Sequence, residues 1–203
     1  MYFSDQDKEK IRRSVIEAEK KTSGEIVPVI IRASDAYPGS YYRSALLWGF
    51  VCVLCCYFFE ATHTVMFWCF SASILAGYLL CYLDFYKKLF ITKQEMEEEF
   101  SQRAYQSFLM NGVSQTKERN GVMLYISAFE KKAMIVSDTG IEEKIKPGTW
   151  EKVITDLISL MKTKDYTSAI CQAVTQLGTL LNEHFPDHKD DEDELANKLI
   201  IEV

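Results

Sequence analysis

The sequence lacks the charge pattern of a protein that binds nucleic acids. Its 23 lysine and arginine residues are outnumbered by 29 acidic residues, so the formal net charge is −6. No stretch rich in lysine and arginine is interleaved with aromatic residues, although such stretches are typical of nucleic-acid-binding surfaces. The composition therefore argues against DNA or RNA as a partner.

The sequence also lacks the local motifs of common phosphate-processing enzymes. It contains no Cys-x5-Arg loop and no G-x-x-x-x-G-K-[ST] loop, which cradle phosphate groups in phosphatases and nucleotide hydrolases. Histidine is scarce: His63 lies between two apolar runs, while His184 and His188 flank Phe185-Pro186. No Ser-His-Asp set can be assembled from this spacing.

Two long apolar runs are the main feature that is present. Ser44–Phe59 and Thr64–Leu83 contain no charged residue, and only residues 60–63 separate them. A helix needs about 20 mostly apolar residues to cross the hydrocarbon core of a bilayer. We therefore expect a transmembrane hairpin over residues 41–86, with spans near 44–62 and 64–83. The alternative is a helical hairpin that is buried in the core of a soluble protein.

Charged residues beside the two runs predict the orientation of the hairpin. Arg43 precedes the first run, Lys87 and Lys88 follow the second, and Glu60 lies in the connecting loop. Positive charge near the ends of spans favours the cytoplasmic side. We therefore predict a multi-pass membrane protein with two spans, whose connecting loop lies outside and whose termini both lie in the cytoplasm. The lipid bilayer is its first predicted partner.

The remaining residues, 1–38 and 92–203, are enough for one discontinuous cytoplasmic domain. Hydrophobic periodicity predicts an amphipathic helix from Ser4 to near Gly24 and helices over Thr92–Met110, Trp150–Met161 and Ser168–Phe185. Strands are predicted over Glu25–Arg32, Gly121–Ala128 and Ala133–Ser137. A short helix with a capping box is predicted at Thr139–Glu142. The acidic tail from Pro186 is interpreted as a solvated segment. Pro28 weakens the prediction of a strand over Glu25–Arg32, because proline is confined to edges and bulges.

The long connection between the first two strands determines their relative direction. A crossover that contains a helix joins parallel strands in a right-handed sense. The expected fold is therefore α/β, with a small mixed sheet and helices on both faces, interrupted by the hairpin.

This topology brings separate segments together at one edge of the sheet. The first two strands start there and the third strand ends there, so residues 22–25, 116–121 and 137–141 should converge. The residues expected at this edge are Glu25, Thr116, Arg119, Asn120, Asp138 and Glu142, beside the glycines Gly121 and Gly140.

Carboxylate and amide oxygens at such an edge suit a hard cation, Ca²⁺ or Mg²⁺. The candidate metal ligands are Glu25, Asn120, Asp138 and Glu142, and the neighbouring residues with a supporting or structural role are Thr116, Arg119, Gly121 and Gly140. The alternative is structural: Asp138 and Arg119 form a buried pair, and Asn120-Gly121 is a turn that begins a strand.

Several motifs resemble those of the TPM-domain family. They are TSGEI at Thr22–Ile26, FLMNGVSQTKERNGVMLYIS from Phe108 to Ser127, DTGI at Asp138–Ile141, Trp150, and LNEHFP with a later DEL between Leu181 and Leu195. The paired apolar runs after the first strand resemble a bacterial membrane-bound branch of that family. Ser137 stands where many relatives have glycine.

The resemblance implies a three-layer α/β domain and leaves the activity open between two classes. Some members are described as calcium-binding or as noncatalytic modules that assist membrane complexes, and acid phosphatase activity has been proposed for others. We therefore expect a membrane-anchored TPM-like binding and assembly module that depends on a divalent metal and acts with other membrane proteins or further copies of itself. The alternative is a metal-assisted acid phosphatase with Asp138 as the candidate catalytic residue.

Overall fold

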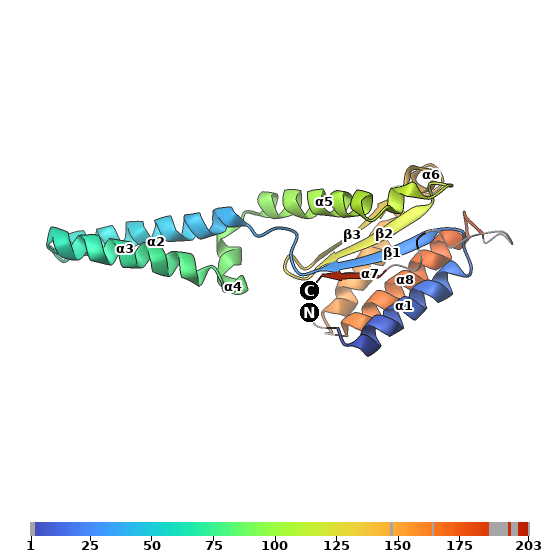
Figure 1. Ribbon diagram of the computed structural model, residues 1–203, viewed down its shortest axis with the longest axis horizontal. Coiled ribbons are helices and arrows are strands. Elements are labelled where there is room, and N and C mark those ends of the chain that lie inside the picture. The colour runs from blue at the N-terminus through green and yellow to red at the C-terminus, as the bar shows by residue number, and fades with distance from the viewer. Residues whose placement is uncertain (1–2, 147, 164, 187–194, 196–198, 203) are drawn as a thin grey trace. The chain divides into compact units, whose positions relative to one another are not determined.

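The computed structural model describes residues 3–146, 148–163, 165–186, 195 and 199–202. Contacts divide the chain into two compact units, which are described separately (Figure 1). The first unit, which we call the α/β unit, comprises Met1–Ser34 and Phe100–Val203, and the second, the hairpin unit, comprises Asp35–Glu99.

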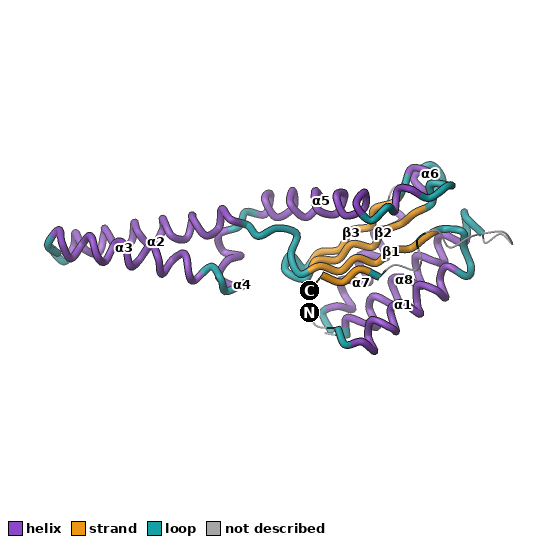
Figure 2. Tube along the Cα trace, viewed as in Figure 1, coloured by secondary structure: helices purple, strands orange, loops and turns teal. Residues whose placement is uncertain are grey.

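A four-stranded mixed sheet forms the centre of the α/β unit, with strand order β3-β2-β1-β4 (Figure 2). Strands β1 (Glu25–Ile31) and β2 (Gly121–Ser127) are parallel, with Glu25 opposite Gly121. Strand β3 (Lys132–Ser137) is antiparallel to β2. The predicted mixed sheet and the parallel pairing of the first two strands are confirmed.

The fourth strand, β4 (Ile200–Glu202), was not predicted from the sequence. It pairs in parallel with residues Val29–Ile31 of β1. Because this pairing begins at Val29, it leaves Pro28 with a ladder partner on the β2 side alone. Pro28 therefore lies where β1 is locally an edge strand, which explains how a proline without an N–H group is tolerated there.

Helices cover both faces of the sheet, so the predicted three-layer arrangement is confirmed. Helices α1 (Asp5–Glu19), α7 (Thr149–Met161) and α8 (Tyr166–Asn182) pack on one face, and the part of α5 (Lys93–Met110) from Phe100 onward packs on the other. The alternating side chains of β1 and β2 separate accordingly. Ile26, Ile30, Val122, Leu124 and Ile126 face the three-helix layer, while Val27, Val29, Met123 and Tyr125 face Phe100, Ala104 and Phe108 of α5.

Helix ends differ from the predicted ones by a few residues. The first helix ends at Glu19 rather than near Gly24, and Thr22 and Ser23 instead bond to the carbonyl of Phe185. The last long helix covers Tyr166–Asn182 rather than Ser168–Phe185. Residues 187–194 of the predicted solvated tail, six of which are acidic, lie outside the described residues.

The hairpin unit contains two long antiparallel helices and a short connection to α5. Helix α2 covers Pro38–Phe58 and α3 covers His63–Leu80, followed by α4 (Asp84–Lys87) and the 3-10 turn η1 (Lys88–Phe90). Helix α2 begins at Pro38, about two turns before the apolar run that starts at Ser44. The Ser44 hydroxyl donates a 2.7 Å hydrogen bond to the carbonyl of Gly77, which joins α2 to α3.

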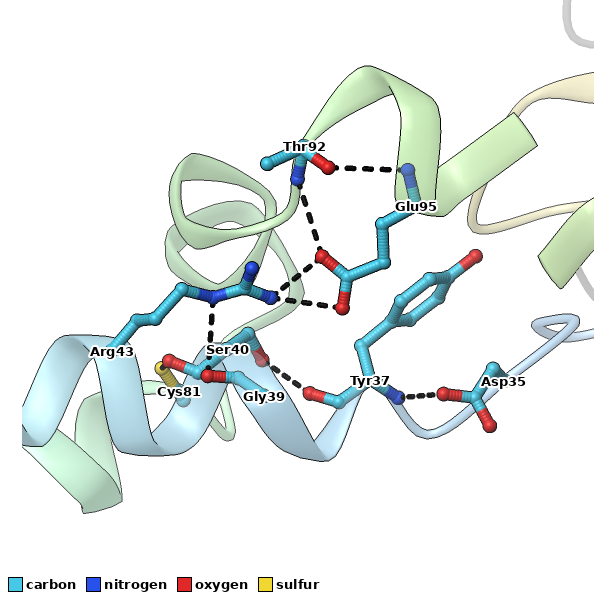
Figure 3. Close-up of polar contacts among 8 residues, drawn as sticks. All are labelled: Asp35, Tyr37, Gly39, Ser40, Arg43, Cys81, Thr92 and Glu95. Carbon is cyan, nitrogen blue, oxygen red and sulfur yellow. Dashed lines mark hydrogen bonds and ion pairs between the residues drawn. The ribbon is translucent and has the colours of Figure 1, made fainter. Parts of the chain in front are cut away.

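A polar cluster holds together the base of the hairpin unit (Figure 3). The Arg43 guanidinium bonds to both carboxylate oxygens of Glu95, at 2.6 and 2.9 Å. Glu95 also forms a capping box with Thr92, because the Glu95 N–H donates to Thr92 Oγ1 at 3.1 Å and the Thr92 N–H points back to Glu95 Oε2. Arg43, one of the basic residues from which the orientation of the hairpin was predicted, thus forms an ion pair with Glu95 in the first turn of α5.

Large apolar side chains of α2 and α3 remain exposed. Phe58 is 82% exposed and Trp68 is 67% exposed, and most of the exposed large apolar residues of the described chain lie between Tyr42 and Leu89. Only 17% of the most apolar 18-residue window of α2 and 6% of that of α3 is buried. By length and composition, both helices are able to cross a membrane.

Candidate functional site

The predicted convergence at one edge of the sheet is present within the α/β unit. The Glu25 N–H donates to the carbonyl of Asn120 at 3.2 Å, and the Asp138 N–H donates to the carbonyl of Gly121 at 3.0 Å. These bonds join the starts of β1 and β2 to the end of β3. We call Glu25, residues 116–121 and residues 138–142 the Asp138 edge.

Asp138 is the most enclosed acidic group of this edge, with 3% of its surface exposed. Its Oδ1 accepts a 2.7 Å hydrogen bond from the Thr139 N–H, so Asp138 caps the N-terminus of α6 (Thr139–Glu142). The same oxygen lies 3.0 Å from a guanidinium nitrogen of Arg119. The sequence predicted a capping box that begins at Thr139, and the observed cap lies one residue earlier.

The second carboxylate oxygen of Asp138 has a different environment. Oδ2 is buried and has no hydrogen-bond partner among the described residues. A buried carboxylate oxygen without a partner costs free energy, on the order of 1–3 kcal/mol or more. Such an oxygen fits a bound cation or an ordered water molecule, and it is the feature of this edge that the structural alternative does not explain.

Asn120 and Thr116 hold the loop that precedes β2. The Asn120 side-chain amide donates to the carbonyl of Ser23, and the Asn120 N–H donates to Thr116 Oγ1 at 3.1 Å. Both residues are buried, at 5% and 3% exposed. Asn120 thus connects the residues before β1 to the loop before β2, which is a structural role whether or not a metal binds.

Arg119 and Gly140 meet where the loop passes over α6. Arg119 has a φ of +54°, and its carbonyl accepts a 3.1 Å hydrogen bond from the Gly140 N–H. A Cβ atom at Gly140 would lie 2.7 Å from the carbonyl oxygen of Glu118 and 2.8 Å from that of Arg119. Only glycine therefore allows α6 to lie against this loop without a shift of the backbone.

The four predicted metal ligands are not equally placed. Glu25 is 9% exposed at the start of β1, whereas Glu142 is solvent-exposed on α6. Among the residues that the structure describes, no group of three or more His, Cys, Asp or Glu side chains is arranged to hold a metal ion. The Asp138 edge therefore offers two buried carboxylate oxygens that accept no hydrogen bond from any described residue, Asp138 Oδ2 and Glu25 Oε2, rather than a preformed carboxylate cage, and Arg119 competes for the Asp138 carboxylate.

Substitution of Asp138 by alanine is expected to lower the free energy of unfolding of the α/β unit by about 1–3 kcal/mol without loss of the fold. The substitution removes a helix cap and an ion pair whose arginine is half exposed. Denaturant unfolding in detergent measures the change, and Glu142→Ala, on the exposed side of α6, is the matched control with an expected change below about 0.5 kcal/mol. Equal effects of the two substitutions would contradict the role of Asp138 as a cap.

A second buried polar cluster, which was not predicted, lies at the opposite end of the strands. Glu130, which is 6% exposed, accepts a hydrogen bond from the Ser127 hydroxyl and a 2.9 Å bond from the Ser34 N–H. The Ser34 hydroxyl lies 3.4 Å from the Tyr125 hydroxyl. These contacts fix Ser34, the last residue of the first segment of the α/β unit. The sequence did not predict this cluster, because its polar residues stand singly in a strand and in turns and form no motif.

Tyr125 in this cluster is expected to ionise at a higher pH than an ordinary tyrosine. Burial raises its pKa to about 12, although the hydrogen bond with Ser34 lowers it slightly. The Tyr125 hydroxyl loses its proton near pH 10 in the unfolded chain and near pH 12 in the folded chain. The free energy of unfolding is therefore unaffected by the ionisation of this group below pH 10 and falls by about 2–3 kcal/mol as the pH rises from 10 to 12. A difference titration of phenolate absorbance between wild type and Tyr125→Phe measures the pKa, and ionisation near pH 10 would contradict the prediction.

Comparisons with known proteins agree with this fold. The model of the family described as the TPM domain matches residues 88–180, which include β2, β3 and the Asp138 edge except Glu25. The solution structure of the BA42 protein from the psychrophilic bacterium Bizionia argentinensis superposes with a TM-score of 0.64 at 19% sequence identity, over 99% of this chain and 96% of that one. No curated protein matches the sequence. Residues 88–180, a little under half of the chain, thus resemble the TPM domain, and the likeness to the BA42 protein shows a shared fold.

Proposed function

We propose that this protein is a membrane-anchored TPM module that binds and assembles with other membrane proteins. The observation that carries the proposal is the exposure of the apolar surface of α2 and α3. Soluble proteins rarely expose a contiguous apolar patch larger than a few hundred Å², and the side chains of both helices remain largely uncovered. A bilayer covers such a surface, and the alternative of a buried hairpin does not account for it.

Two helices can both anchor a domain and contact other spans. The hairpin contributes the small residues Ser71, Ala72 and Ser73, which permit close approach of another helix. Ser71 and Ser73 bond to carbonyls of their own helix, so they present little unsatisfied polarity to lipid. The proposed partners are therefore membrane proteins, including further copies of this chain.

A photocrosslinking experiment tests the assembly proposal. A photoreactive residue at Trp68, which is 67% exposed on α3, is expected to give protein adducts of discrete mass in intact membranes. The same probe at Glu60, in the loop, is the matched control and should give few such adducts. Lipid adducts alone at Trp68 would indicate an anchor without a protein partner and would contradict this part of the proposal.

We further propose that the Asp138 edge binds a divalent cation weakly. The orphaned Oδ2 of Asp138 supplies one charged ligand, and Mg²⁺ in proteins is often held by one or two carboxylates with several waters. Arg119 lies 3.0 Å from the other oxygen of Asp138 and opposes a second positive charge. The alternative function, a metal-assisted phosphomonoesterase, would use this same edge, with Asp138 at its centre.

Calcium and magnesium titrations of the full chain in detergent, followed by amide NMR, test the cation site. Saturable shifts are expected at Glu25, Asn120 and Asp138. Arg119→Gln should tighten binding several-fold because it removes the competing charge, whereas Asp138→Asn should abolish it. Glu142→Gln is the control with little expected effect. If no variant responds to either cation in a folded sample, the Asp138 edge is a structural cap and turn.

The enzyme alternative has a separate outcome. If the wild type hydrolyses a phosphomonoester above background and Asp138→Asn abolishes turnover while it keeps the amide spectrum of the wild type, the module is catalytic. Turnover that Asp138→Asn retains would assign the activity to a contaminant or to another part of the molecule.

A further inference from the structure

A cavity of about 450 Å³ lies in the α/β unit, among the loop between β2 and β3, the end of α7 and the start of α8. Its lining includes Ile158 and Met161 of α7, Tyr166 of α8, and the lysines Lys131, Lys132 and Lys162. It is separate from the Asp138 edge, because it lies at the strand ends where β2 turns into β3. Cavities of about 300–1,000 Å³ are typical of sites for small ligands.

One of the three lysines, Lys132, has its ammonium group 5.8 Å from the centroid of the Phe100 ring. Neither Lys131 nor Lys162 forms an ion pair with any residue in the described part of the structure, and no acidic side chain is among those that line the cavity. Lys131 has a φ of +56° at the last position of the β2–β3 loop, where a residue other than glycine is uncommon.

The lining combines apolar and basic groups. Ile158, Met161 and the Tyr166 ring form an apolar wall, and Met161 and Tyr166 also pack against the core of the three-helix face. Lysine ammonium groups bind phosphate as strongly hydrated point charges. The combination fits an anion that is attached to an apolar group, and it does not fit a cation or a purely polar sugar.

We propose that this cavity binds a phosphate ester that carries an apolar group, with the phosphate between Lys131 and Lys162 and the apolar group against Ile158 and Met161. The same chemistry occurs in the headgroup region of an anionic phospholipid and in a soluble phosphate ester. The site does not depend on a cation at the Asp138 edge, so the two proposals can fail independently.

Short-chain lipids test the site with the full chain in a neutral detergent. Dihexanoyl phosphatidylglycerol is expected to cause saturable amide shifts at Ala128, Lys131 and Tyr166, and dihexanoyl phosphatidylcholine, with its compensating positive charge, should cause much weaker ones. The double variant Lys131→Gln/Lys162→Gln should weaken phosphatidylglycerol binding at least tenfold. Lys152→Gln, which changes an exposed lysine of α7 outside the cavity, should leave it unchanged.

Glycerol 3-phosphate distinguishes the two sources of the ligand. Much weaker binding than that of phosphatidylglycerol would support a lipid, because the apolar wall then contributes to affinity. Equal binding that the double variant abolishes would show a phosphate site to which the apolar wall contributes nothing, and would contradict the placement of an apolar group against Ile158 and Met161. Unaltered binding in the double variant, or equal shifts with phosphatidylcholine, would overturn the proposal.

Discussion

Replacement of residues 41–86 by a short glycine–serine linker is expected to move the protein from the membrane fraction to the soluble fraction and to leave the α/β unit folded. The linker removes most of the exposed large apolar side chains of the described chain. Burial of each such side chain in an apolar medium contributes about 1.5–3 kcal/mol, so the hairpin contributes on the order of 20 kcal/mol or more to membrane partition. The two core clusters of the α/β unit contain no residue from 41–86, so its fold should persist.

Alkaline extraction of membranes measures this partition. Wild type should stay with the lipid, and the linker variant should appear in the supernatant with a dispersed amide spectrum. Tyr105→Ser/Leu109→Ser is the matched control, because it removes exposed apolar side chains of α5 and should leave the protein in the membrane. Extraction of the wild type into the supernatant would contradict membrane insertion.

Gly121→Ala is expected to destabilise the α/β unit by about 3 kcal/mol, an effect at the upper end of those of added methyl groups in packed cores. A Cβ atom at this position would overlap the carbonyl oxygen of Val113 and would lie 2.8 Å from Val113 Cγ1. Val113 is fully buried, and Gly121 is held in register opposite Glu25, so neither backbone can yield easily. The Asp138 edge should loosen together with the loop from Val113 to Asn120.

Thermal unfolding in detergent measures the effect of this substitution. Gln115→Ala, at an exposed position of the same loop, is the control and should change the free energy of unfolding by less than about 0.5 kcal/mol. A melting temperature of Gly121→Ala close to that of the control would show that the loop adapts and that the close approach is not required.

The order of the main elements was predictable because local patterns and chain topology agree. A nearly continuous β-branched strand, Glu25–Ile31, followed by a long helical excursion to Gly121–Ser127 allows only a parallel pair with common starting ends. The meeting of Glu25, Asn120 and Asp138 at one edge follows from that topology. Their approximate positions could therefore be predicted without any knowledge of side-chain contacts.

Features that depend on tertiary packing could not be predicted in this way. Strand β4 has three residues and forms only because Val29–Ile31 of β1 offers an unpaired edge, and so short a segment has no periodicity of its own. The cap at Asp138 rather than Thr139 depends on the backbone angles at the end of β3. The Lys131–Lys162 cavity joins residues 31 positions apart in the sequence, and neither lysine stands out by its local sequence.

The central claim is that α2 and α3 span a membrane, with the α/β unit on one side and the loop at Glu60 on the other. The most direct test is protease accessibility in sealed right-side-out vesicles of a chain with one cleavable insertion, placed either after Glu60 or at the C-terminus. We expect cleavage after Glu60 in intact vesicles and cleavage at the C-terminus only after the vesicles are opened. Cleavage of both insertions from the same side of a sealed membrane would contradict a spanning hairpin.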